Sequence, residues 1–212
     1  MNKTLTRQEA LQLVRSDGNN LKSLSKEFKK DNEIVMSAVT QNGHSLKFAD
    51  VKLRKDKKIA IKALQNQHRE IIKYGVIRHV HKSLRKDKQV VLTELRRWGE
   101  SLEYVDSFLR KDKEVVMVAT RRSNLALYYA DSSLKKNSKF ILEIIMKHPR
   151  FKKWPEHNAG ILHYVDKSLK SNKKFFLSLV KLHGSYLNYA SPSVQKDKQI
   201  QKIAQKTYSK IK

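Results

Sequence analysis

The apolar and polar positions of this chain recur with a period of about 25 residues. Residues 112–136, DKEVVMVATRRSNLALYYADSSLKK, match the length and nearly every apolar position of residues 87–111, DKQVVLTELRRWGESLEYVDSFLRK. Residues 31–55 and 172–196 are further copies of the same pattern. A pattern repeated at this spacing is typical of stacked supersecondary units, so the sequence predicts a repeat array.

Each repeat carries two predicted helices and a final turn. Val115, Val116 and Ala119 fall on one side of a first helix of about eleven residues. A second short helix is expected over residues 125–130. Residues suited to cap the first helix precede it in successive repeats: Asp31, Asp56, Asp87, Asp112, Asn137, Asn172 and Asp197. The final turn begins with a second set, in which His81 and Ser191 depart from aspartate: Asp50, His81, Asp106, Asp131, Asp166 and Ser191.

The first helices are expected to end at residues that tolerate the left-handed backbone conformation, namely Gly18, Gly43, Gly99, Asn124 and Gly184. Two short helices and a turn cannot bury their own apolar face, so neighbouring repeats must stack. Strict alternation, which would indicate strands, is absent. The sequence predicts an all-α, solenoid-like array of about seven helix-turn-helix repeats.

We expect one helical-repeat domain over residues 1–212. Its repeats are 6–30, 31–55, 56–86, 87–111, 112–136, 137–171 and 172–196, followed by a half repeat at 197–212. The third repeat has six additional residues around HREIIKYG, and the sixth has ten around KHPRFKKWPEHN.

The pattern DKEVV…A…NG..L.YA...LR.D resembles the helical repeats named domain of unknown function 4116, which occur in large viruses, protists and intracellular bacteria. The resemblance extends from about residue 6 to the C-terminus and is specific in repeats two, four, five and seven. Repeats three and six depart from it by insertion. The resemblance implies an α-helical repeat architecture and supplies no catalytic residues.

The composition adds a strong positive charge: 46 Lys and Arg against 20 Asp and Glu give +26. Such a surplus costs self-repulsion unless an acidic partner relieves it. Nucleic acid is the commonest such partner, followed by anionic membrane surfaces and acidic proteins. Genome base composition accounts for many lysines, but less easily for so few acids.

Many of these cations lie at the repeat boundaries. Equivalent positions of a solenoid align along one edge, so they should form a ladder with steps of roughly 10 Å that follows a phosphate backbone. The alternative is a solvated face that keeps the array in solution. The candidate nucleic-acid-binding residues are Arg54, Lys55, Lys57, Lys58, Arg85, Lys86, Lys88, Arg110, Lys111, Lys113, Lys135 and Lys136.

Two further groups are candidates for the same interface. Arg96, Arg97, Arg121 and Arg122 suit bidentate phosphate contacts, although the helix dipole alone also favours cations there. Lys152, Lys153 and Trp154 lie in the insertion of the sixth repeat. The Trp154 ring either stacks on a base, fills a partner's pocket, or folds back against the array.

Nothing in the sequence indicates catalysis. There is no cysteine, and no two of the eight histidines form the i, i+4 pair around a glutamate that a helical zinc protease needs. The recurring aspartates are explained by capping, and no glycine-rich phosphate loop is present. We therefore expect a protein that is not an enzyme and holds no metal or cofactor.

We predict a non-catalytic module that contacts RNA or a ribonucleoprotein through phosphates and shape. The alternative is a protein–protein adaptor for an acidic partner, either a host-directed effector or a structural component of a virion or other large assembly. No secretory signal or apolar run of roughly 20 residues is visible, and no integral-membrane partner is expected. The expected location is the cytoplasm or a large assembly such as a virion or ribonucleoprotein particle; export by a non-classical route stays open.

Overall fold

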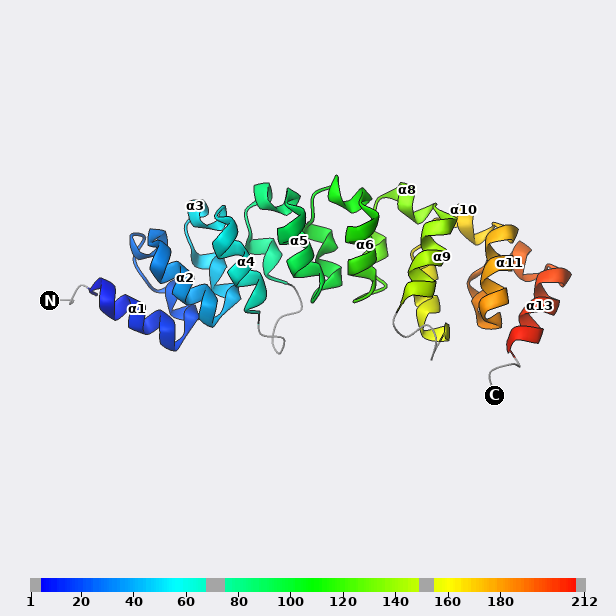
Figure 1. Cartoon of the computed structure of the whole chain (residues 1–212), viewed down its shortest axis with the longest axis horizontal. Coiled ribbons are helices and arrows are strands. Elements are labelled where there is room, and N and C mark those ends of the chain that lie inside the picture. The colour runs from blue at the N-terminus through cyan, green and yellow to red at the C-terminus, as the bar shows by residue number, and fades with distance from the viewer. Residues whose placement is uncertain (1–4, 68–74, 149–154, 209–212) are drawn as a thin grey trace. The chain divides into compact units, whose positions relative to one another are not determined.

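The computed structural model of the chain is built from α-helices and short 3-10 helices, denoted η, with no strand among the residues it describes. These residues are 5–67, 75–148 and 155–208, the last range without the side chains of 155–158. The predicted all-α repeat architecture is confirmed (Figure 1). The described chain forms two compact units, Met1–Leu109 and Arg110–Lys212, which are treated separately below. The single-domain organisation stays a prediction.

The N-terminal unit alternates longer α-helices with short helical turns. Its α-helices are α1 (Arg7–Ser16), α2 (Asn32–Gln41), α3 (Val51–Arg54), α4 (Lys57–Gln65) and α5 (Lys88–Leu95). Its 3-10 helices are η1 (Gly18–Lys22), η2 (Phe28–Lys30), η3 (Gly43–Phe48), η4 (Val76–His79), η5 (Lys82–Lys86) and η6 (Gly99–Tyr104).

The C-terminal unit follows the same order, after η7 (Leu109–Lys111) at the boundary between the units. Its α-helices are α6 (Lys113–Thr120), α7 (Ala126–Tyr129), α8 (Ser132–Lys135), α9 (Ser138–Lys147), α10 (Lys167–Lys170), α11 (Lys173–Leu182), α12 (Pro192–Gln195) and α13 (Lys198–Tyr208). Its 3-10 helices are η8 (Pro155–His163) and η9 (Gly184–Tyr189).

The predicted N-caps are confirmed. The Asp31 carboxylate accepts the backbone N–H groups of Glu33 and Ile34 at 2.9 and 3.1 Å, and Asp56, Asp87, Asp112 and Asp197 cap their helices in the same way. At the second cap, Asp131 accepts the N–H of Ser133 at 2.9 Å. His81 replaces aspartate there, and its Nδ1 accepts the N–H of Ser83 at 3.2 Å.

The prediction that the first helices end at left-handed residues is wrong, because no described residue has a positive φ angle. The residue before the repeat glycine is extended instead, as at Asn42, where φ is −145°. Its side chain accepts the N–H of His44 at 3.0 Å and thereby caps the following 3-10 helix. Asp17 and His183 cap η1 and η9 in the same manner.

The repeat glycines are required by a close approach between backbones of neighbouring repeats. A Cβ atom on Gly43 would overlap the carbonyl oxygen of Ala63, which lies in α4, the first helix of the next repeat. Gly18 meets the carbonyl of Ala38 in the same way, and Gly184 meets that of Ala204. The Gly43 N–H also donates to the Asn66 carbonyl at 2.8 Å, so the approach is held by a hydrogen bond.

The core consists of apolar faces buried between stacked repeats. In α2 the residues at the inner positions, Ile34, Val35, Ala38 and Val39, are all fully buried. Within the N-terminal unit α1 packs on α2, α2 on α4, and α4 on α5, while in the C-terminal unit α11 packs on α13. No helix in the described ranges is both long and apolar enough to cross a bilayer.

Replacing Gly43 by alanine should lower the free energy of unfolding by about 1–3 kcal/mol, because the added methyl group meets backbone that cannot move aside. Gly160→Ala is the matched control, since its methyl group would meet only the end of the Asn124 side chain at 3.0 Å. The control should stay within about 1 kcal/mol of the wild type. Urea unfolding of both variants checks the difference, and equal midpoints would contradict the assignment.

Candidate nucleic-acid interface

One backbone hydrogen bond recurs between neighbouring repeats and defines an edge of each unit. The N–H of the second cap donates to a carbonyl that lies two residues before the first cap of the same repeat, as from Asp50 to Lys29 at 3.0 Å. The same bond joins His81 to Arg54 and Asp106 to Arg85 in the N-terminal unit. In the C-terminal unit it joins Asp131 to Arg110, Asp166 to Lys135 and Ser191 to Lys170. The boundary cations are therefore held in one register within each unit.

The cations whose carbonyls accept this bond form what we call the capping row, and they are half-buried: Lys29, Arg54, Arg85, Arg110, Lys135 and Lys170. Several of their side chains turn back onto the carbonyls that end the second helix of their own repeat. Arg85 donates to the Arg78 carbonyl at 2.8 Å, and Lys135 donates to the Tyr128 carbonyl at 3.2 Å. The candidates Arg85 and Lys135 are thus engaged within their own repeats, and Arg54 and Arg110 lie in the same half-buried row.

Several of the cations that directly follow a first cap form ion pairs between repeats. Lys57 Nζ lies 2.7 Å from Asp87, and Lys173 Nζ lies 2.9 Å from Asp197. Arg7 makes the same contact with Asp31 at 2.8 Å, and its guanidinium holds the pKa of that carboxyl below its ordinary value. Such exposed pairs contribute only about 0–1 kcal/mol, but they neutralise the cation. The candidate Lys57 is therefore engaged.

Between these two sets lies the lysine row, one residue before each first cap: Lys30, Lys55, Lys86, Lys111, Lys136 and Lys196. All six are exposed, and no hydrogen bond or ion pair of their side-chain ammonium groups is found among the described residues. The first three belong to the N-terminal unit and the last three to the C-terminal unit. Ser171 holds this position in the sixth repeat. The lysine row is therefore a part of the predicted ladder that is available to a ligand.

Positive charge is less balanced around His81, which replaces the usual aspartate, than around Asp131. Partial burial, and then the neighbouring charges of Lys55, Lys82 and Arg54, lowers the pKa of His81. At Asp131 the Ser133 hydroxyl and, more weakly, Lys111 lower the carboxyl pKa, so one negative charge faces the lysine row there. The absence of such a carboxylate leaves the surroundings of Lys55 more positive.

The remaining candidates divide between exposed and engaged cations. Arg97 donates to the carbonyls of Gln65 and Gln67 at 2.8 and 3.1 Å and so holds the end of α4. Lys88 is half-buried. The exposed candidates outside the lysine row are Lys58, Lys113, Arg96, Arg121 and Arg122. Lys152, Lys153 and Trp154 lie outside the described residues, so the hypothesis for this insertion stays a prediction.

Sequence reasoning missed a buried carboxyl in the N-terminal unit. Glu94 is fully buried and accepts hydrogen bonds from Gln67 and from the Ser101 hydroxyl, the latter at 2.8 Å. Burial raises its pKa to about 7, against the opposing effect of these donors. Its carboxyl oxygen occupies the space where a Cβ on Gly75 would lie. The signal was a glutamate at the position where α2, α4 and α6 carry Ala38, Ala63 and Ala119.

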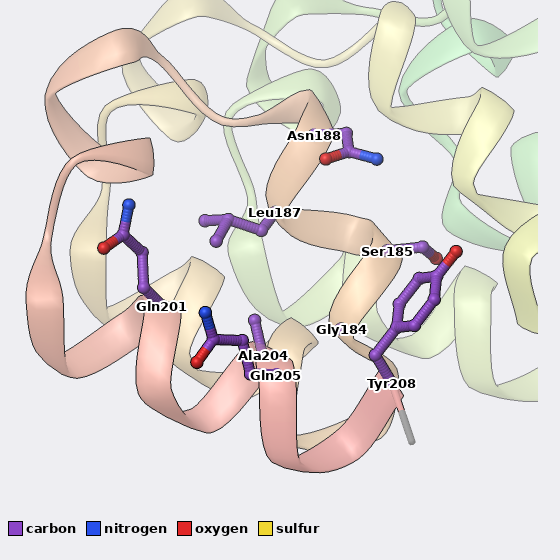
Figure 2. Close-up of a pocket in the computed structure, with 8 residues that line it drawn as sticks. All are labelled: Gly184, Ser185, Leu187, Asn188, Gln201, Ala204, Gln205 and Tyr208. Carbon is purple, nitrogen blue, oxygen red and sulfur yellow. The ribbon is translucent and has the colours of Figure 1, made fainter. Parts of the chain in front are cut away.

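A pocket of about 420 Å³ opens between η9 and α13 (Figure 2). Gln201 and Gln205 line it from α13, at positions that the buried Val35 and Val39 hold in α2. The Gln201 amide donates to the Gln195 carbonyl at 2.8 Å, and Tyr208 is 65% exposed at the rim. This face of α13 is polar, and no lysine or arginine lines the pocket.

The described histidines do not gather into a metal site: in these ranges no three His, Asp or Glu side chains converge as ligands. The rings of His44 and His79 lie 6.2 Å apart edge to face. Burial, followed by the charge of Arg78, lowers the pKa of His79 to about 4, so this ring is neutral at pH 7. The neutral His79 ring packs against His44 as a contact between η3 and η4.

Comparison with known proteins identifies the repeat. The family model described as "Domain of unknown function (DUF4116)" matches residues 6–54, 33–75, 95–135, 112–170 and 137–195. No curated protein and no solved structure matches the chain.

Glu94→Gln should remove a pH dependence of stability. Because the folded pKa is raised, the folded state binds the Glu94 proton more tightly than the unfolded state does. The contribution of Glu94 to the free energy of unfolding should therefore be greatest below pH 4.5. It should fall by about 3 kcal/mol as the pH rises to 7. Urea unfolding across this range measures the difference between wild type and variant. Parallel pH profiles would contradict the prediction.

Proposed function

The chain belongs to the family described as domain of unknown function 4116, so its activity has to be inferred from its own surface, and we propose that it binds RNA. The binding module is non-catalytic. Its contacts are made by the lysine row, through phosphates rather than base edges.

The observation that carries this proposal is the sorting of the boundary cations. Side chains of the capping row such as Arg85 and Lys135 donate to carbonyls, and Lys57 and Lys173 after the first caps pair with aspartates, yet the ammonium groups of the lysine row have neither kind of contact among the described residues. Exposed ammonium groups held in one register suit a ligand whose own charges are regularly spaced. A nucleic-acid backbone is such a ligand, and each contact releases a condensed counterion.

We favour RNA bound through its backbone over a DNA duplex recognised by its sequence. The ammonium group of lysine is a point charge, and it lacks the fork of donors with which an arginine guanidinium recognises the edge of a guanine. The net charge of +26 strengthens attraction to any polyanion and does not by itself select one. Selectivity must come from the spacing of the lysines within each unit. An acidic protein partner is the rival outcome of the tests below.

The first test replaces Lys111, Lys136 and Lys196 together by glutamine. Loss of three phosphate contacts should weaken binding to a single-stranded RNA and reduce the slope of log K against log salt by about 2. Fluorescence anisotropy of a labelled RNA over a range of salt concentrations measures both effects. The same design applies to Lys30, Lys55 and Lys86 in the N-terminal unit.

The matched control replaces Lys139, Lys181 and Lys206, which are equally exposed on α9, α11 and α13 and lie outside the lysine row. Both variants lose three charges from the same unit. The control should change the slope by less than about 0.5. Equal losses of affinity in the two variants would mean that RNA binding depends on total charge and not on the lysine row. If the wild-type protein bound no RNA, the proposal would be wrong and an acidic protein would be the alternative partner.

A second prediction concerns His81. Bound phosphates should offset the charges of Lys55, Lys82 and Arg54 that disfavour the imidazolium, so RNA binding should raise the pKa of His81. By linkage, affinity should increase as the pH falls through the titration of this ring. NMR titration of the imidazole with and without RNA measures the change, and salt of about 0.5 M, which releases the RNA, should abolish it. An unchanged pKa would place the RNA elsewhere.

A further inference from the structure

A second surface position recurs beside the lysine row, and its chemistry differs between the two units. It lies three residues before the second cap, where the carbonyl accepts the capping-row side chain in several repeats. In the N-terminal unit the position is charged: Lys22, Lys47, Arg78 and Glu103. In the C-terminal unit it carries planar side chains that can contact bases, and these are exposed: Tyr128, His163 and Asn188.

Two of these planar side chains line one pocket of about 420 Å³ in the C-terminal unit. Its wall is formed by α10 with the end of η8 on one side and by η9 with the start of α12 on the other. The residues that matter for ligand chemistry are His163, Lys167, Lys170, Asn188 and Tyr189. The pocket thus combines two cations, two aromatic rings and one carboxamide.

The aromatic side chains of this pocket pack against each other, and two of its polar side chains are exposed. The rings of His163 and Tyr189 lie 5.0 Å apart at an angle of 73°, which forms an aromatic corner. Lys170 is held at the rim by the His163 carbonyl at 3.4 Å. Lys167 and Asn188 are exposed, and no hydrogen bond to either side-chain head group is found in the described structure. One ammonium and one carboxamide are therefore available to a ligand.

We propose that this pocket binds one nucleotide of a single-stranded RNA. The base packs in the corner formed by His163 and Tyr189, the Asn188 carboxamide hydrogen-bonds to the base edge, and Lys167 contacts the phosphate. Base stacking on rings and cationic contact with the backbone are the usual means of holding single strands. A carboxamide offers a donor and an acceptor side by side, which matches the edge of adenine.

This inference rests on the proposed RNA binding and deepens it by naming the form of RNA and the base contact. A duplex buries its bases in the stack, so only an unpaired nucleotide can enter the pocket. The pocket of Figure 2 is less suited to a nucleotide, because it has amides and Tyr208 but no cation to receive a phosphate. The pocket lined by His163 and Asn188 has both parts.

The test measures affinity for a labelled eight-nucleotide oligoadenylate and for an RNA duplex of equal charge, by anisotropy at fixed salt. The variants are His163→Ala, Asn188→Ala and Lys167→Gln. His163→Ala and Asn188→Ala should each lower affinity for oligoadenylate by about five-fold or more and leave affinity for the duplex within about two-fold. Lys167→Gln should lower affinity for oligoadenylate and also its salt dependence.

Gln199→Ala and Lys139→Gln are the matched controls, since both residues are exposed in the same unit and neither lines the pocket. They should bind oligoadenylate as the wild type does. Circular dichroism and thermal unfolding establish that all five variants keep the fold, which is expected because the replaced side chains of the three pocket residues are exposed.

The outcomes separate the two proposals. If the wild-type protein binds no RNA, the proposed function fails and this inference fails with it. If RNA is bound through the lysine row but His163→Ala and Asn188→Ala bind oligoadenylate as the wild type does, the pocket assignment alone is overturned. The last measurement compares the affinity for adenosine monophosphate with that for the eight-mer. Binding of this mononucleotide as tight as that of the eight-mer would overturn the assignment to a strand in favour of a free nucleotide.

Discussion

The contact on which the repeat structure depends is the approach of a glycine to the backbone of the next first helix. At Gly43 there is no room for even one carbon atom beyond the backbone, because the Ala63 carbonyl fills the space. The Gly43 N–H is satisfied by the Asn66 carbonyl in the same region. At Gly18, Gly43 and Gly184 a repeat is thereby held against its neighbour by backbone atoms, which do not vary with the side chains around them.

This constraint explains how a chain of short helices presents ordered charges. Once two first helices are fixed, the turns that join them are fixed as well, and the second-cap N–H reaches a carbonyl of the preceding repeat. Cations on either side of that carbonyl then differ in surroundings although they are neighbours in sequence. Arg85 donates to carbonyls, Lys86 remains in solvent, and Lys57, which directly follows a first cap, pairs with Asp87.

The third repeat meets the same constraint with different chemistry. Gly75 still approaches the following helix, but the group that fills the space is the Glu94 carboxyl. Gln67 and Ser101 donate to this carboxyl, which reduces the cost of its burial. A polar cluster at this point links the stability of the N-terminal unit to pH, whereas a glycine-to-carbonyl contact does not titrate.

The sequence alone determined the period, the helical class and the capping residues, because these follow from local spacing and from side-chain chemistry at helix ends. Asp31 and Asp131 cap helices through N–H groups two or three residues away, and such contacts need no knowledge of the rest of the chain. The role of the glycines was misread for the same reason: a glycine after a helix is typical of a left-handed end, and the packing that requires Gly18 and Gly43 comes from another repeat.

For the candidate interface, the sequence identified the basic boundaries but not which cations are available. Arg54, Lys55 and Lys57 read alike in sequence, yet the structure places them respectively in a half-buried row, in solvent and in an ion pair. The pocket between His163 and Asn188 was also invisible, since its walls are 25 residues apart. Only tertiary structure decided these points, because the partners of a side chain across a repeat interface are set by stacking and not by the residues beside it in the chain.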